Sequence, residues 1–244
     1  MKTVKRNNKY FAALELPVIA NMNPRSVYNK VDEFHAFVEE ENVDILFMSE
    51  SWKRENLQLD QIIHLDNHTI ISNVYQRKGQ GGRPALIANS NKYHVKDITN
   101  TLINVKWGVE AVWCIVTPKN VSKDSKIHKI ACGSIYLKPG SKHKSDLLDH
   151  ISDAFNLLSA RYGKGLHFCL AGDTNVLKLE SILNLSPNLL QVVTKPTRID
   201  PKTGREVILD PIITTLGIFY QEPECLEPLD SDPDKNGKSL ITEL

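Results

Sequence analysis

The chain has 244 residues, of which 41% are hydrophobic and 24% are charged, and its formal net charge is +1. These values are ordinary for a globular protein and exclude a disordered or fibrous class, and the near-zero charge excludes a nucleic-acid binder that relies on a global basic field. The length suffices for one large α/β domain. No composition shift divides the chain, so we expect a single domain over residues 13–244. We expect an N-terminal extension over residues 1–12 before it.

The cysteines and the apolar segments argue against a zinc protein, a secreted protein and a membrane-spanning protein. Cys114, Cys132, Cys169 and Cys225 lack the C-x-x-C spacing of zinc sites, and three of them lie in apolar strand-like runs. The basic start and the short run YFAALELPVIA lack the cleavage site of a signal peptide, and no apolar stretch is long enough to span a bilayer. We therefore expect an intracellular protein that binds no membrane.

The first elements along the chain alternate between strand and helix. LPVIAN is typical of a strand, and Val27, Val31, Phe34 and Val38 then repeat at helical spacing, with Ser26 as the expected helix cap. VDILFMSES follows as a continuous apolar run that is typical of a strand buried on both faces. The opening unit is thus predicted to be strand, helix and strand.

Strand candidates dominate the rest of the chain. They are HTIISNV, RPALIAN, YHVKDI, GVEAVWCIVTP and HKIACGSIYLKP, and Gly, Pro, Asn and Lys clusters separate them. Leu147, Leu148, Ile151, Phe155 and Leu158 predict a second helix, which is followed by the strand GLHFCLAGD. The loop-rich remainder carries VILDPIITT and the short segment SLITEL. Two helices among many strands favour a layered α/β sandwich over a doubly wound parallel fold.

Polar side chains stand at the ends of several of these apolar runs. Carboxylates, amides and a phenol gathered at sheet ends suit a hard divalent cation and a phosphoryl oxygen. Each residue also has an ordinary interpretation as a helix cap, a turn former or a solvated strand end, and taken singly Asn21 and Asn23 favour that interpretation. The residues in question are Asn21, Asn23, Glu50, Tyr136, Asp173, Asn175 and Asp210.

In order and local context, these residues resemble the endonuclease/exonuclease/phosphatase superfamily. The resemblance is closest to the apurinic-endonuclease-like domain of LINE-type, non-LTR retrotransposons. It runs from ANMNPRSVYNK through DILFMSESW, GGRPALIAN, GVEAVWCIVTPKN, GSIYLKPGS and HFCLAGDTN to ILDPIITT. It implies a four-layered sandwich of two mixed β-sheets flanked by helices, and a hydrolysis that nicks one DNA strand and leaves a 3′ hydroxyl.

The resemblance also implies roles for the matching residues. Glu50 and Asn21 would hold Mg²⁺, with Mn²⁺ as the alternative ion. Tyr136 would position the scissile phosphate. Asp173 would orient or deprotonate the attacking water, and Asn175 would donate to the phosphate oxygens as charge develops there.

Further residues and partners follow from the same resemblance. Asp210 takes the place of a late supporting aspartate. DNA is the expected partner, and the chain is expected to act as a monomer in the nucleus, with a reverse transcriptase domain as a possible neighbour in a longer gene product. The residues expected to contact phosphate or DNA are Asn23, Arg25, Arg83, Thr197 and Arg198.

The family's closing Ser-Asp-His motif has no counterpart here. An alignment at Ser231 ends in Pro233, and the preferred alignment at Ser239 puts Ile241 in the place of the histidine. Neither side chain can donate to phosphate or carry a proton. The last histidine of the chain, His167, lies within LHFCL, where a core or strand-edge role is expected.

The sequence therefore predicts an endonuclease-like domain of retrotransposon origin with an incomplete C-terminal motif. The closing strand is expected to be truncated, which leaves an unpaired sheet edge unless SLITEL fills the gap. Three functions stay open: a metal-dependent DNA nickase, an inactive relic with at most weak metal or DNA binding, and a phosphodiesterase or phosphatase that acts on lipid headgroups or inositol phosphates.

Overall fold

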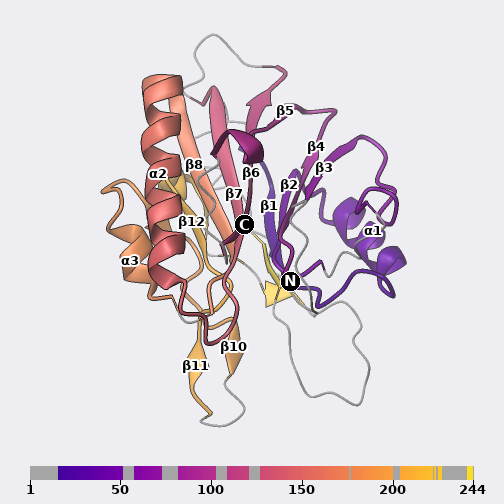
Figure 1. Cartoon of the computed structure of the whole chain (residues 1–244). Helices are drawn as coiled ribbons and strands as arrows, with labels where there is room; N and C mark the ends of the chain where they lie inside the picture. Colours follow the sequence, from indigo (N-terminus) through magenta and orange to yellow (C-terminus); the bar gives the residue numbers. More distant parts are fainter. Residues whose placement is uncertain are drawn as a thin grey trace.

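The fold is a sandwich of two β-sheets with helices on both outer faces (Figure 1). Helix α1 packs on the outer face of the first sheet, and helices α2 and α3 pack on the outer face of the second. The predicted four-layered sandwich of two mixed sheets is confirmed. The computed structural model describes residues 16–51, 58–72, 82–102, 109–120, 127–175, 177–199, 204–221, 223, 225–226 and 241–243.

The first sheet has the spatial order β13-β14-β1-β2-β4-β3. β1 and β2 run parallel, and the other neighbours are antiparallel. Of the segment SLITEL, Ile241–Glu243 form β14, which fills the place beside β1 and pairs with both β1 and β13. The strands are β1 (Ile19–Met22), β2 (Ile45–Met48), β3 (His68–Ser72), β4 (Ala85–Asn89), β13 (Cys225–Leu226) and β14 (Ile241–Glu243).

The second sheet has the order β5-β6-β7-β8-β12-β9, and β7 and β8 are its parallel pair. VILDPIITT does not form one strand: it divides into β11 and β12 around Asp210. β10 (Arg198–Ile199) and β11 (Glu206–Val207) form a separate hairpin that extends beyond the lower end of this sheet in Figure 1. The strands are β5 (Tyr93–Asp97), β6 (Glu110–Pro118), β7 (Lys129–Tyr136), β8 (Leu166–Asp173), β9 (Leu190–Gln191) and β12 (Ile212–Thr214).

The predicted apolar stripes lie in α1 and α2, except that Val27 precedes α1, and one predicted cap is wrong. Ser26 does not cap α1, because the helix begins five residues later and its N-cap residue, Lys30, makes no side-chain cap. Ser26 has a φ of 96° and its hydroxyl accepts the Tyr28 N–H, so the residue belongs to the preceding turn. The helices are α1 (Val31–Glu40), α2 (Lys144–Tyr162) and α3 (Leu179–Leu183), with 3₁₀ turns η1 (Thr99–Leu102), η2 (Gly163–Gly165) and η3 (Gly217–Phe219).

The central apolar layer lies between the two sheets and decides which strand residues face the site. Ile19 and Phe47 from the first sheet meet Val112 and Cys132 from the second in this layer. Because strand side chains alternate between faces, the residues two positions along each strand, including Asn21 on β1, also face the inter-sheet space. The polar strand ends therefore continue the same face as the core.

Three cysteines lie side by side in this central layer. Cys114 pairs with Cys132, and Cys132 pairs with Cys169, on adjacent strands. All three are free and fully buried, and burial raises the pKa of the Cys132 and Cys169 thiols. They act as small core side chains, as the sequence predicts for the apolar runs that contain them.

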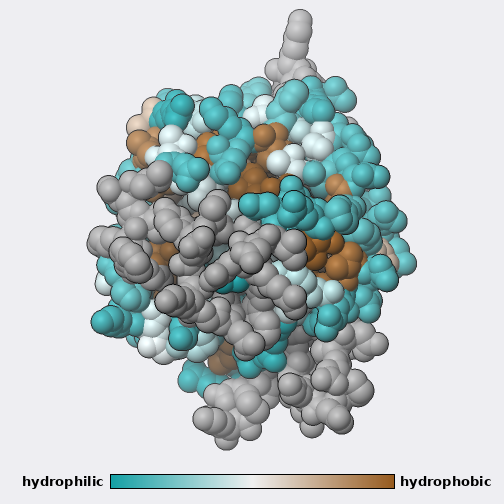
Figure 2. All heavy atoms as spheres, turned by 45° about the vertical axis from the view of Figure 1, so that its right-hand side comes forward, coloured by the Kyte–Doolittle hydropathy of each residue, from teal (hydrophilic) through white to brown (hydrophobic). Residues whose placement is uncertain are grey.

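The face of the molecule shown in Figure 2 is mostly polar among its coloured residues. Figure 2 shows the face that carries the first sheet and α1, where the coloured residues are largely hydrophilic and the hydrophobic ones form small patches. Among the described helices, none combines the length and the apolar character needed to cross a bilayer.

Candidate active site

The site lies where the ends of strands from both sheets meet. Tyr136 and Asp173 end the parallel strands β7 and β8 and are direct partners in register. Asn21 lies on β1 of the opposite sheet, and its side-chain amide donates to the carbonyl of Gly172 at 3.3 Å. This bond joins the two sheets directly beside Asp173. The carboxyl ends of two parallel strand pairs thus meet at one end of the sandwich.

Asn23 is the residue that brings the two sheets' carboxylates together. Its side-chain nitrogen donates to Glu50 Oε1 at 3.1 Å and to Asp173 Oδ2 at 3.1 Å. Its oxygen accepts the backbone N–H of Arg25 at 3.2 Å, which fixes the orientation of the amide. The structure therefore places Asn23 between Glu50 and Asp173, at the centre of the site.

Asp173 is a buried carboxylate with an altered acidity. Its Oδ1 accepts the backbone N–H of Asn175 at 2.9 Å, and its side chain is 3% exposed. Burial, with a smaller contribution from the nearby Glu50, raises the pKa of Asp173 to about 6, although the hydrogen bonds from Asn175 and the charge of Arg198 lower it. A carboxylate with this pKa can hold or release a proton near neutral pH, as a general base requires.

Asp210 lies beneath the same cluster, immediately before β12. Its backbone N–H and that of Leu209 donate to the hydroxyl of Thr197, which is itself fully buried. Burial raises the pKa of Asp210 well above its ordinary value, and the charge of Asp173 adds to the rise, whereas Thr197 and Arg198 lower it. Thr197 thus supports the Asp210 turn, and Arg198 is a cation close enough to act on both aspartates.

Asn175, Arg25 and Arg83 lie in turns, where their backbones have positive φ values. Asn175 has a φ of 44°, and its side-chain amide donates to the carbonyl of Leu137 at 2.8 Å, so one of its two N–H groups holds the loop after Tyr136. Arg25 has a φ of 48° and is exposed, and Arg83 has a φ of 67° and is partly buried. The structure brings their backbones to the rim of the site.

Two residues that sequence reasoning missed lie next to this cluster. Glu110 begins β6 directly opposite Tyr136, and its carboxylate accepts the Arg83 N–H at 2.7 Å. Ser51 is fully buried, and its hydroxyl donates to the Arg83 carbonyl at 2.7 Å. The available signal is the position of Glu110, a carboxylate at the start of an apolar strand.

The donor set suits a hard divalent cation. The charge of Glu50 raises the pKa of Asp173, and the charges of Asp173 and Glu50 raise the pKa of Asp210, so a cation would relieve a repulsion that is already present. Asn21 Oδ1 is buried and has no hydrogen-bond partner among the described residues, which is the state of an oxygen that can serve as a ligand. Among the described residues no group of three His, Cys, Asp or Glu side chains forms a ligand cluster, but Mg²⁺ needs only one or two carboxylates.

The described part of the site contains no histidine. His167 lies near the start of β8, six residues before Asp173, which at strand spacing is about 20 Å away. Its ring contacts the hydroxyl of Thr215. Of the two alignments for the closing motif, Ser231–Pro233 and Ser239–Leu240 lie outside the described residues. Ile241 begins β14, where the next residue, Thr242, is the partner of Asn21.

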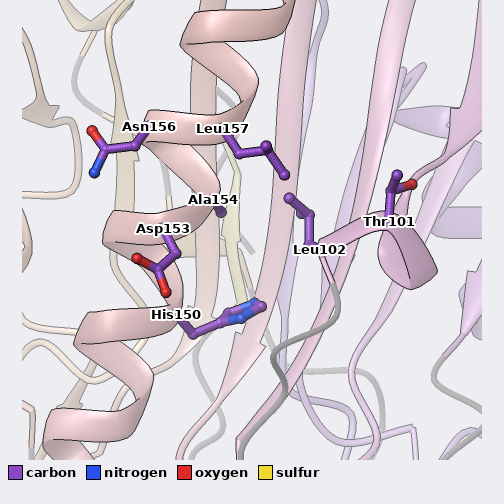
Figure 3. Close-up of a pocket in the computed structure, with 7 residues that line it drawn as sticks. All are labelled: Thr101, Leu102, His150, Asp153, Ala154, Asn156 and Leu157. Carbon is purple, nitrogen blue, oxygen red and sulfur yellow. The ribbon is translucent and has the colours of Figure 1, made fainter.

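A separate cavity of about 420 Å³ lies on the outer face of the second sheet, between α2 and η1 (Figure 3). Leu102 and Leu157 point toward each other across it. His150 lines its floor, and the Trp113 indole donates to His150 Nε2 at 3.0 Å. Burial lowers the pKa of His150, so this imidazole is a neutral acceptor that joins helix to sheet and takes no part in the strand-end site.

No protein-family model matches the chain, and no curated protein matches it. Its structure is similar to that of the Neisseria 3′ phosphatase NExo bound to a product DNA hairpin, with 10% identity, 93% of this chain and 98% of that one covered, and a TM-score of 0.63. An endonuclease/exonuclease/phosphatase from Bacteroides vulgatus has 13% identity, coverage of 93% and 97%, and a TM-score of 0.59.

A third similar structure is the endonuclease domain of TRAS1, a telomere-specific non-LTR retrotransposon. It has 12% identity, coverage of 93% of this chain and 97% of that one, and a TM-score of 0.57. Identities at this level show the fold, and they agree with the architecture built above from two mixed sheets and their helices. The chain therefore has the endonuclease/exonuclease/phosphatase fold.

Proposed function

We propose that the chain is a divalent-metal-dependent phosphodiester hydrolase that nicks DNA, of the type found in non-LTR retrotransposons. The observation that carries the proposal is the bridge from Asn23 to both Glu50 and Asp173, which gathers carboxylates from two sheets at one point. Similar folds are known in a retrotransposon endonuclease domain and in a DNA-bound 3′ phosphatase, and these support DNA as the substrate.

Each residue then has a chemical task. Glu50 and Asn21 would hold Mg²⁺ or Mn²⁺, and a bound ion would stabilise negative charge on the phosphate oxygens. Asp173, with a pKa of about 6, takes a proton from the attacking water. Tyr136 lies beside Asp173 in register and positions the phosphate, and Arg198 adds positive charge near the same carboxylates.

A supercoiled plasmid incubated with the protein and Mg²⁺ tests this proposal. We expect slow conversion to the nicked circle, abolished by EDTA and by Glu50→Ala. The matched control is Glu39→Ala, which removes an exposed carboxylate on α1 and leaves the site intact. A plasmid that stays supercoiled at high protein concentration would show that the chain does not nick DNA.

A second candidate function is binding of metal and DNA without hydrolysis. The observation that favours it is the sequence after His167, which contains no histidine to contact the scissile phosphate. General acid–base groups contribute roughly 10²- to 10⁴-fold to rate, so this loss alone can reduce turnover below detection. Mg²⁺-dependent retention of a DNA duplex in a gel-shift assay, lost in Glu50→Ala, together with an intact plasmid, would favour this function over the first.

The fold also leaves a small-substrate phosphatase or phosphodiesterase as an alternative, because one structural neighbour is a 3′ phosphatase. Release of phosphate from a 3′-phosphorylated oligonucleotide or from an inositol phosphate, with no action on the plasmid, would favour that alternative.

A further inference from the structure

Glu110, Tyr136 and Asp173 form a row across three adjacent strands at the site end of the second sheet. We propose that Glu110 is a positioning residue for Glu50: its carboxylate holds the backbone of residues 82–84, and that backbone in turn holds Ser51 and Glu50. This inference rests on the proposed function of the site, since it assigns Glu50 the role of a metal ligand. It adds a residue that lies on the other sheet and is connected to Glu50 through the backbone of Arg83 and through Ser51.

The loop at Gly82 and Arg83 is built around the Glu110 carboxylate. Both residues are in the left-handed region, with φ values of 72° and 67°, which is unusual for an arginine. The Arg83 N–H donates to Glu110 Oε2 at 2.7 Å, a short charge-assisted bond. A Cβ on Gly82 would lie 2.2 Å from the same oxygen, so the glycine is what allows the chain to pass this close.

The other side of the Arg83 peptide is held by the residue after Glu50. The Arg83 carbonyl accepts the Ser51 hydroxyl at 2.7 Å and the Ser51 N–H at 3.4 Å. On the preceding side, the Ser26 N–H donates to the Glu50 carbonyl at 3.0 Å. Glu50 lies beyond the end of β2, so these contacts take over from the sheet in fixing its backbone.

The path therefore runs from one sheet to the other through two hydrogen-bond contacts and one peptide bond. Glu110 fixes the Arg83 N–H, Arg83 fixes Ser51 through its carbonyl, and Ser51 is covalently joined to Glu50. A strained loop conformation persists only where its surroundings enforce it, and here the carboxylate is the group that does so. Without the carboxylate, Gly82 and Arg83 are free to leave the left-handed conformation. The Glu50 side chain is then no longer held in place for its hydrogen bond with Asn23.

Terbium luminescence gives a test that does not depend on catalysis. Tb³⁺ is a hard, oxygen-seeking probe, and its binding to the folded full chain would be titrated for the unmodified protein and for Glu110→Ala. Loss of an outer-shell partner commonly weakens metal affinity by about 10- to 100-fold, and we expect a loss in this range. The Mg²⁺ concentration for half-maximal nicking should rise in parallel, whereas saturating Mg²⁺ restores most of the rate.

Three further variants separate positioning from simple stability. Glu110→Gln keeps an oxygen acceptor for the Arg83 N–H and should restore much of the Tb³⁺ affinity. Ser51→Ala cuts the path at its second contact and should weaken Tb³⁺ binding even if Glu110→Ala does not fold. Arg83→Gly keeps the left-handed backbone and should bind Tb³⁺ as tightly as the unmodified protein while it loses DNA affinity.

Equal Tb³⁺ affinity in the unmodified protein, Glu110→Ala and Ser51→Ala would overturn the inference. If the variants weaken Tb³⁺ binding while no protein nicks the plasmid, the positioning role stands and the proposed hydrolysis fails. If the unmodified chain binds no Tb³⁺, both the metal site and the role of Glu110 are wrong.

Discussion

Asn23, the residue that follows β1 of the first sheet, donates a 3.1 Å hydrogen bond to Asp173, which ends a strand of the second sheet. The same nitrogen donates to Glu50, so a single neutral amide lies between two carboxylates. In the absence of a cation, these two bonds help to offset the repulsion between the acidic groups, together with the Asn175 N–H and the charge of Arg198. The identity of residue 23 therefore sets the balance between stability of the metal-free protein and affinity for metal.

Replacing Asn23 by aspartate tests this balance. The variant loses both donor bonds and adds a third negative charge, so the metal-free protein should unfold more easily, by about 2–3 kcal/mol, which is the usual effect of removing one partner from charged groups. An added carboxylate should also strengthen Mg²⁺ binding. Thermal melts with and without Mg²⁺ should show a lower Tm without the ion and a larger increase on its addition than the unmodified protein shows.

The pKa of Asp173 predicts an unusual dependence of stability on pH. Folding raises this pKa from 3.8 to about 6, so between these values the folded state binds more protons than the unfolded state. Stability from this group is therefore full below pH 4 and is lost as the pH rises to 6, by up to ~3 kcal/mol. Asp173→Asn should be more stable than the unmodified protein at pH 7 and lack this dependence, whereas Asp32→Asn, an exposed change on α1, should retain it.

The same pKa sets the pH dependence of any hydrolysis. A general base must be ionised before it can take a proton, so the nicking rate at saturating Mg²⁺ should rise from pH 5 and level off by pH 7, with a midpoint no higher than about 6. Bound Mg²⁺ would move the midpoint lower, because a nearby cation favours the carboxylate. A rate that falls over this range would exclude Asp173 as the base.

The sequence predicts the sheets better than it predicts the turns. Apolar runs such as VDILFMS and KIACGSI form strands that are buried on both faces, because nearly every side chain in them is apolar or small. The stripe from Leu147 to Leu158 forms the inner face of α2. The cap at Ser26 was wrong because the backbone takes two left-handed residues there, Arg25 and Ser26, before the helix begins. Such conformations depend on contacts with distant residues, here the Glu50 carbonyl.

The candidate site, like the fold, can be predicted from the sequence only in part. Glu50, Asp173 and Asn21 could be picked from the sequence because each is a polar residue at the end of an apolar run. That Asn23 joins the first two, and that Asn175 donates to Leu137, depends on how two sheets are placed against each other. Glu110 looks like an ordinary solvated strand start in the sequence, and only the path of residues 82–84 around its carboxylate distinguishes it.

Gly172 should be one of the least replaceable residues near the site. Its φ is 135°, and a Cβ there would lie 1.9 Å from the carbonyl oxygen of Ile135 on the neighbouring strand. Gly172→Ala should therefore destabilise the fold by more than ~3 kcal/mol, because both backbone strain and a clash with main chain must be relieved. Gly140→Ala is the matched control: it has a φ of 71° but open space around it, so only the strain of about 1 kcal/mol should appear in chemical denaturation.

His150 predicts a second pH dependence, of opposite sign to that of Asp173. Its pKa is lowered by burial, and its Nε2 accepts the Trp113 indole N–H, so the folded protein holds it neutral. Below pH 6.5 the His150 imidazole takes up a proton in the unfolded chain but stays neutral in the folded chain. The free energy of unfolding therefore falls as the pH drops from 7 toward 5. His150→Gln keeps an acceptor for Trp113 and should remove this loss when the unfolding free energy is followed by urea titration. His94→Gln, an exposed change on β5, should leave the loss unchanged, and an unaltered slope in His150→Gln would show that another group is responsible.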